Sequence, residues 1–397
     1  MKGDMNDAGR NAHEAAVALY LLLGQQPALF RRWREQHGGC ARALAALRRH
    51  PAGLGDARRA VVRDWPDGPA ATATQRQWQH ALDWLALPGN ALWQDCATTL
   101  PAALAGLPPD ECPPLLFLAG NAEALALPQI AVVGSRAATR YGLDQARRIA
   151  ADLAQGGFAI TSGLASGIDG AAHEGALAVG GRTLAVLGCG PDICYPPSHA
   201  GLARRIIAEG GLLLSAYVPG TRALRHHFPE RNRIISALSL GVLVVEAGPD
   251  SGSILTARAA HDMSRDVWAL PGPVTSLQSR GCHQLLRHEQ AQLVEGATDV
   301  VADALPRLRE WLGPQASASS GQAAPELAPR PTPVERRVPP CTGAATLLAA
   351  MDTQPWSLDA LMAAGHGQAS VLMAWLGELE VAGWVAVVPG GWQRVPA

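Results

Sequence analysis

The sequence predicts an α/β protein whose main domain is a parallel sheet covered by helices on both faces. From about residue 129 to residue 272, short apolar segments rich in β-branched residues alternate with segments whose apolar residues have helical spacing. Most of the short segments run into a glycine, and buried parallel strands joined by helices have this pattern. The flanking segments predict a helical domain in front of the sheet and a winged helix behind it.

Residues 10–87 are predicted to form the helical domain. The segments "AHEAAVALYLLLG" and "PALFRRWREQHGGCARALAALRRH" carry apolar residues at helical spacing and stop at glycine or proline. A proline-rich passage, "LPAALAGLPPDECPPLLFLAG", follows them. We place the sheet domain at residues 110–305.

Six strands and several connecting helices are expected in the sheet domain. The strands, in chain order, are "QIAVVGS", "GFAITSG", "RTLAVLG", "GLLLSAY", "LGVLVVEAG" and "DVWALPG". The helical segments between them include "YGLDQARRIAADLAQGG", "IDGAAHEGALAVGG" and "SILTARAAHDMSR". A strand–helix alternation of this length predicts a Rossmann-like domain.

The last part of the chain is predicted to be a linker followed by a small domain. Residues 313–340 are rich in Pro, Ala and Ser and lack periodicity, as flexible linkers do. In residues 343–397, three helical segments, one of them capped by Ser357, precede two short strands around a Pro-Gly-Gly turn, which is the order of a winged helix. This domain has four acidic residues against a single arginine, Arg394. Because phosphate contacts dominate affinity for DNA, we expect a protein-contact or regulatory module rather than a duplex reader.

Composition limits the possible functions. The net charge is -1, so any site for nucleic acid must be a local basic surface. Lys2 is the only lysine, which leaves none for a Walker A loop. Seven irregularly spaced cysteines predict neither a disulfide framework nor a zinc site, and we expect Cys189 and Cys194 to be reduced thiols. With no signal-peptide pattern and no apolar run long enough to span a membrane, we expect a cytoplasmic protein without metal or cofactor.

Glycine-rich turns at the strand ends predict a site for phosphate. Ligands of open parallel sheets bind at the carboxyl ends of the strands. In the turn Gly134-Ser135-Arg136 a hydroxyl and a guanidinium stand before a helix N-terminus, where backbone N–H groups can bind an anion. The dinucleotide fingerprint G-x-G-x-x-G is absent. Asp169 and His173 could form an acid–base pair on one helix, but we interpret them as a helix N-terminal carboxylate and a packed neighbour, and we predict no catalytic residue.

The stretch "RALRHHFPERNRIISALSLGVLVVEAG", residues 222–248, combines cations with an aromatic ring just before a buried strand. Its chemically distinctive residues are Arg225, Phe228, Arg231 and Arg233. Between residues 130 and 233 there are eleven arginines against seven acidic residues. Cations beside an aromatic platform suit single-stranded nucleic acid, since phosphates bind the cations and a base stacks on the ring. A structural Arg–Glu corner involving Glu230 remains an equal alternative from these residues alone.

The order of the motifs resembles that of the DNA-processing protein A family, also called DprA or Smf. The motifs are "AVVGSRAATRYG", "SGLASGIDGAAHEGAL", "LGCGPDICYPPSH", "FPERNRIISALS", "VVEAGPDSGSILTARAA" and "ALPGPV". The resemblance is close over residues 110–305 and weaker on both flanks, where it implies an N-terminal SAM-like helical domain and a C-terminal winged helix. It implies a protein that binds and protects incoming single-stranded DNA and helps to load the RecA recombinase during natural transformation. Dimerisation through the Rossmann-like domain is also implied.

The resemblance assigns roles to eight residues. Gly134, Ser135 and Arg136 would hold backbone phosphate, Arg225 occupies the position of a basic residue, and Phe228 would stack on a base. The run from Arg231 through Asn232 to Arg233 matches the family's R-N-R, which either contacts DNA or shapes the pocket.

The sequence departs from the family pattern at three places. The usual G-T-G, S-E and G-T-N are here Gly188-Cys189-Gly190, Ser215-Ala216 and Gly281-Cys282-His283. The alternative function is that of a nucleotide phosphoribohydrolase on a similar scaffold. That group carries P-G-G-x-G-T-x-x-E, whereas the corresponding passage "EAGPDSGSILTA" lacks the glutamate three residues after the threonine.

Overall fold

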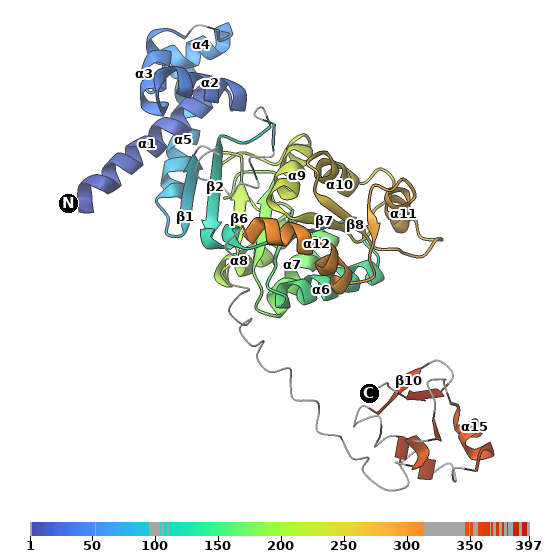
Figure 1. The fold of residues 1–397 in the computed structure, drawn as a ribbon. Helices are drawn as coiled ribbons and strands as arrows, with labels where there is room; N and C mark the ends of the chain where they lie inside the picture. The colour runs from blue at the N-terminus through green and yellow to red at the C-terminus, as the bar shows by residue number, and fades with distance from the viewer. Residues whose placement is uncertain are drawn as a thin grey trace. The chain divides into compact units, whose positions relative to one another are not determined.

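The computed structural model divides the chain into two compact units, Met1–Pro314 and Gln315–Ala397 (Figure 1). In the first unit it describes residues 2–51, 53–94, 104, 107–108 and 111–312. In the second it describes residues 346–348, 350–351, 356–365, 367, 371–372, 375–376, 379, 384–388 and 391–394. The predicted linker at residues 313–340 lies outside the described residues.

Five helices form the N-terminal part, as the spacing of its apolar residues predicts. They are α1 (Lys2–Leu22), α2 (Pro27–His37), α3 (Cys40–Arg49), α4 (Asp56–Arg63) and α5 (Thr72–Leu85). Helix α2 begins with a proline and ends at Gly38, whose φ of 66° is readily adopted only by glycine. The buried residues of these helices share one apolar cluster with the sheet, and the Trp84 and Phe117 rings meet edge to face at 6.1 Å. The helices are therefore packed onto the sheet domain.

The sheet has nine strands, in the order β1-β2-β6-β5-β4-β3-β7-β8-β9. The six predicted strands are confirmed as the parallel part of the sheet: β3 (Gln129–Val133), β4 (Ala159–Ser162), β5 (Thr183–Leu187), β6 (Leu212–Ser215), β7 (Gly241–Val244) and β8 (Asp266–Ala269). Two strands that we did not predict, β1 (Asn90–Gln94) and β2 (Leu115–Gly120), extend one edge in antiparallel order. The short β9 (Gln292–Leu293) adds a parallel strand at the other edge.

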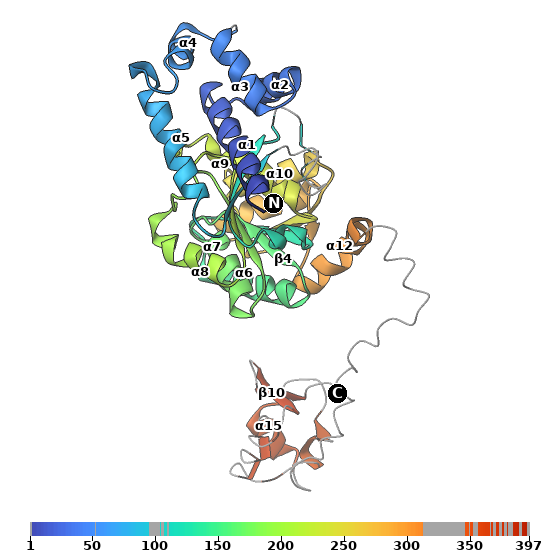
Figure 2. The ribbon, with the colours of Figure 1, turned by 90° about the vertical axis from the view of Figure 1, so that its left-hand side faces the viewer.

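Helices cover both faces of this sheet (Figures 1 and 2). They are α6 (Arg140–Gln155), α7 (Ile168–Ala178), α8 (Ala200–Ala208), α9 (His227–Leu238), α10 (Gly252–Asp262), α11 (Arg280–Arg287) and α12 (Ala297–Leu312). Alternate residues of β3 belong to different cores: Ala131 and Val133 pack with α9, α10 and α11, whereas Ile130 and Val132 pack with α6, α7 and α12. This alternation is the two-residue period of a strand buried on both faces.

Helix α9 corrects the prediction for the arginine-rich stretch. We expected its cations to lie just before a buried strand, but Phe228 to Leu238 belong to α9, and β7 begins only at Gly241. The first turn of α9 lies near the carboxyl ends of the strands. Phe228, Arg231 and Arg233 therefore lie on a helix, which places Phe228 and Arg231 in one pocket and Arg233 in another.

The second unit contains the predicted hairpin and one of the predicted helices within its described residues. Strands β10 (Val385–Val388) and β11 (Gly391–Arg394) pair in antiparallel order, and helix α15 spans Leu358–Ala363. Ser357 caps this helix as predicted, because its hydroxyl accepts a hydrogen bond from the Ala360 N–H at 3.1 Å.

Candidate nucleic-acid interface

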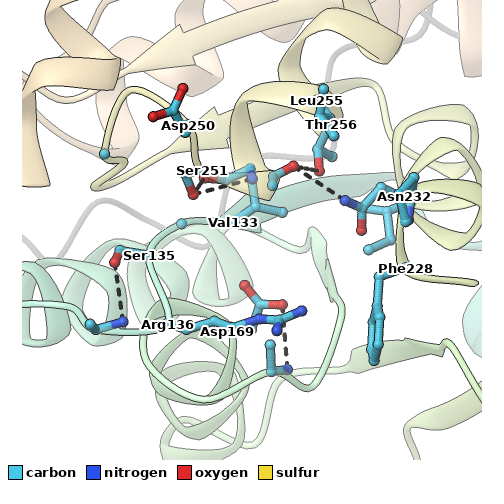
Figure 3. A pocket seen from close by; sticks show the side chains of 18 of the residues that line it. Val133, Ser135, Arg136, Asp169, Phe228, Asn232, Asp250, Ser251, Leu255 and Thr256 are labelled. Atoms are coloured by element: carbon cyan, nitrogen blue, oxygen red, sulfur yellow. Dashed lines mark hydrogen bonds between the residues drawn. The ribbon is translucent and has the colours of Figure 1, made fainter. Parts of the chain in front are cut away.

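A pocket of about 810 Å³ lies at the carboxyl ends of β3, β4 and β7. It is formed by the turns that follow these strands together with the first turns of α9 and α10 (Figure 3). The structure brings seven of the eight predicted site residues into its wall: Gly134, Ser135, Arg136, Arg225, Phe228, Arg231 and Asn232. The pocket is therefore at the end of the sheet where parallel α/β domains bind their ligands.

The turn after β3 is held by internal hydrogen bonds. The Ser135 N–H donates to the Glu246 carbonyl at 2.7 Å, and the Ser135 hydroxyl accepts from the Ala137 N–H at 3.1 Å. The Thr139 N–H and hydroxyl donate to the buried Glu246 carboxylate at 2.8 and 2.6 Å. A protein carboxylate thus occupies the beginning of α6, where the sequence predicted room for an external anion. In this turn the group left to bind an anion is therefore the Arg136 side chain, if the predicted phosphate site exists.

Arg136 and Arg225 are the exposed cations of the pocket wall. Neither side chain forms an ion pair or hydrogen bond with any residue that the structure describes. Their charges are therefore available to a ligand from solution, unlike those of several other arginines in the domain. Arg147, for example, pairs with Glu174 at 3.0 Å.

Phe228 is half-buried and lies in the wall of the pocket rather than in a core cluster. The Arg136 guanidinium carbon lies 5.0 Å from the centre of its ring, and the Arg231 carbon lies 5.9 Å away. Both distances are within the range of cation–π attraction. The ring of Tyr195 approaches at 5.6 Å with an angle of 47° between the ring planes. An aromatic surface with two guanidinium groups beside it is the arrangement that the sequence suggested.

Arg231 forms the floor of the pocket. Its side chain is 3% exposed, and its Nε and Nη1 atoms have no hydrogen-bond partner among the described residues. Burial lowers the pKa of Arg231, an effect opposed by the nearby Asp169 carboxylate. The guanidinium reaches this place only because position 163 is glycine, since a Cβ there would lie 1.3 Å from Nη1.

Asp169 and His173 take the structural places that we expected for them. Asp169 lies in the first turn of α7 and accepts hydrogen bonds from the Gly163 and Ala165 N–H groups at 3.1 and 3.4 Å. Burial raises its pKa, and Arg231 acts in the opposite direction. His173 is fully buried, and its Nδ1 lies 2.6 Å from the Thr183 hydroxyl. Burial lowers the pKa of His173 to about 3, so the ring is neutral.

Arg233 lies outside this pocket. It forms an ion pair with Glu111 and lines a second cavity of about 600 Å³ between the helical part and α9. An arginine–glutamate corner therefore exists, but its acid is Glu111 and not Glu230. The Glu230 carboxylate instead accepts a hydrogen bond from the Tyr217 hydroxyl at 2.8 Å.

Several pocket residues were missed by the sequence analysis. They are Tyr195 and the turn from Gly248 to Ser253, which opens helix α10. Asn232 links the two helices of this wall, because its Nδ2 donates to the Gly252 carbonyl at 3.3 Å. The motifs "CYPPSH" and "GPDSGS" were visible in the sequence. They lie beside Phe228 only because the fold brings the loops after β5 and β7 together, and these strands are far apart in the sequence.

Comparisons with known proteins agree with this architecture. A family model described as DNA recombination-mediator protein A matches residues 94–305. Protein Smf of Escherichia coli is 38% identical over 319 residues, which cover 80% of each chain. The chain belongs to the DNA recombination-mediator protein A family.

Further similarities extend over both parts of the chain. The DNA processing protein DprA of Streptococcus pneumoniae is 45% identical over 49% of this chain and 67% of its own. An X-ray structure of DprA from the same species matches with a TM-score of 0.52 and 36% identity, over 65% of this chain and 90% of that one. A model of the DprA winged helix domain matches residues 322–391, so the predicted winged helix is confirmed.

The remaining expectations concern cysteines, metals and membranes. Cys189 and Cys194 are free thiols, as predicted. The described residues contain no group of three or more His, Cys, Asp or Glu side chains placed to hold a metal ion. None of the helices described is long and apolar enough to cross a membrane.

Proposed function

We propose that the chain binds single-stranded DNA without regard to sequence in the pocket at the strand ends. The observation that carries the proposal is the half-buried Phe228 ring with the unpaired cations Arg136 and Arg225 in the same wall. Exposed guanidinium groups bind phosphates, and an aromatic face stacks on any base. Bases in a duplex are already stacked and paired, so this site favours the single strand.

The family supports a role for this binding in recombination. A recombination mediator delivers single strands to a recombinase, and the function we propose is to protect incoming DNA and help load RecA on it during natural transformation. The protein acts as a homodimer through its Rossmann-like domain. In support, β9 is the last strand of the sheet, and both of its residues, Gln292 and Leu293, are exposed. An aspartate in place of Leu293 should lower the mass measured by light scattering.

The test is fluorescence anisotropy with a labelled oligo-dT strand and with the matching duplex at several salt concentrations. We expect the wild type to prefer the single strand, and the Arg136→Ala/Arg225→Ala variant to bind it weakly. Each phosphate contact contributes about 0.7 to the slope of log affinity against log salt for single strands, so the double variant should lose about 1.4. Equal affinity of the wild type for both DNA forms would contradict the proposal.

A matched control uses two exposed arginines of the helical part, Arg42 and Arg48. Their replacement by alanine removes the same charge and should leave the affinity for oligo-dT within about twofold, because neither lies at the pocket. A loss equal to that of the pocket variant would assign the binding to net charge and not to this site.

A further inference from the structure

We propose that Tyr195 is a second base-stacking residue, and that Tyr195 and Phe228 select single strands by binding two adjacent bases in inclined planes. The inference rests on the proposed function, because it assumes that the pocket binds DNA. It adds a residue and a physical reason for the selection of the single strand.

Tyr195 has the exposure and the position that stacking requires. Its side chain lies in the pocket wall, and the residue is 45% exposed although its ring lies 5.6 Å from that of Phe228. A large aromatic side chain so exposed at the mouth of a pocket offers apolar area that a ligand can cover. Stacking on such a ring is tolerant of sequence, because every base has a π-face.

The angle between the two rings determines what they can bind. Neighbouring bases in a stacked strand are nearly parallel, whereas the Tyr195 and Phe228 ring planes differ by 47°. Two adjacent bases can therefore lie flat on the two rings only when they unstack from each other and the backbone turns between them. In a single strand this change is small. In a duplex it also breaks base pairs, at a free-energy cost of a few kcal/mol.

The loop that carries Tyr195 is held in place before any ligand binds. Its beginning is fixed by Ser215, whose hydroxyl donates to the Cys189 carbonyl at 2.6 Å, and by the Gly190 N–H, which donates to the Thr221 carbonyl at 2.8 Å. Within the loop, the Cys189 thiol donates to the Ile193 carbonyl at 3.0 Å. A ring on a rigid loop loses little conformational freedom on binding, which favours affinity.

The N-terminal helical part contributes to this rigidity. His80 of α5 lies 2.8 Å from the carboxylate of Asp192, which also accepts from the Gly220 N–H at 2.9 Å. A second contact joins Gln77 of α5 to the Thr221 hydroxyl at 3.1 Å. Helix α5 therefore fastens together the loop of Tyr195 and the loop that leads to Arg225. This gives the helical part a role in positioning the stacking surface.

The first test replaces Tyr195 and measures affinity for oligo-dT and for duplex across salt concentrations. Tyr195→Ala should weaken single-strand binding about 5- to 150-fold, the contribution of one stacked base, with an unchanged salt slope and unchanged duplex affinity. Tyr195→Phe should bind as the wild type does. The control is Tyr141→Ala, since Tyr141 is 46% exposed on α6 and is not a pocket residue.

A structural role for Tyr195 is separated from stacking by Tyr195→Leu. Leucine retains apolar packing against Phe228 but has no flat face. Single-strand affinity as low as that of Tyr195→Ala supports stacking, whereas recovery of wild-type affinity overturns it. If the wild type does not prefer single strands, the proposed function itself fails. If it does and Tyr195→Ala does not change that preference, only the present inference fails.

Unstacking of adjacent bases is measured directly with an oligo-dT strand that carries two neighbouring 2-aminopurines. Their exciton circular dichroism arises only while the two bases stack on each other. Binding by the wild type should abolish this signal, and binding by Tyr195→Ala at saturating concentration should leave it largely intact. An unchanged signal in the wild-type complex overturns the inference.

Discussion

Replacement of Phe228 by alanine separates a ligand-binding ring from a core ring. Truncation of a fully buried phenylalanine costs roughly 3–5 kcal/mol of stability. Phe228 is only half-buried and opens onto the pocket, so we expect the free energy of unfolding to fall by roughly 1 kcal/mol or less. Loss of one stacked base should instead weaken single-strand binding by about 1–3 kcal/mol, or about 5- to 150-fold.

The assay combines anisotropy with urea unfolding of the same variants. Stacking releases no counterions, so the salt slope of Phe228→Ala should equal that of the wild type, in contrast to the arginine variants. Phe158→Ala is the matched control, because Phe158 is 5% exposed in the core of α6 and α7. It should lose roughly 3–5 kcal/mol of stability and little affinity. A loss of stability for Phe228→Ala as large as that of the control would refute the stacking role.

Three other outcomes are expected. Gly163→Ala should displace the Arg231 guanidinium, lower stability by roughly 1–3 kcal/mol and weaken single-strand binding, as urea unfolding and anisotropy will measure. Burial lowers the pKa of His173 from 6.5 to about 3. Between these pH values the unfolded chain protonates this histidine and the folded chain does not, so the free energy of unfolding falls as the pH drops through this range. From pH 7 to 4.5 the loss should be roughly 2–3 kcal/mol, and smaller in His173→Gln. Deletion of residues 315–397 should leave duplex affinity unchanged, because this segment has six acidic residues against four arginines. The single arginine of the winged helix, Arg394, already donates to the Leu348 carbonyl at 3.2 Å. A large loss of duplex affinity would contradict the regulatory role.

The sequence predicted the parallel strands well because each is buried on both faces and therefore nearly continuous in apolar residues. β1 and β2 were missed because they pair in antiparallel order at an edge, and β2 follows a proline-rich passage. Helix α9 was not recognised because Pro229 and two arginines, Arg231 and Arg233, interrupt its apolar spacing. Apart from Phe228, its apolar residues lie in its last turns, a few residues before β7.

Pocket residues could be predicted where a short motif already contains the side chains that would bind a ligand. The turn Gly134-Ser135-Arg136 and the residues around Phe228 could be proposed from local pattern, since a cation or an aromatic ring keeps its character wherever the chain places it. Arg233 matches the same pattern but points to the other side of α9, and only the helical phase separates it from Arg231. The residue types alone therefore do not show which arginines face the pocket. This depends on the helical phase of α9.

The Glu246 carboxylate shows why the chemistry of the site also depended on the fold. Glu246 follows β7 and Thr139 precedes α6, and only the pairing of β3 with β7 brings them to hydrogen-bond distance. The carboxylate satisfies the start of α6 and places a negative charge where a phosphate could otherwise bind. In the binding that we propose, backbone phosphate is thus excluded from the helix end and contacts the exposed guanidinium groups of Arg136 and Arg225 instead. Such a site would contact the phosphates of a DNA backbone along the surface instead of fixing one phosphate, which suits the sequence-independent binding that we propose.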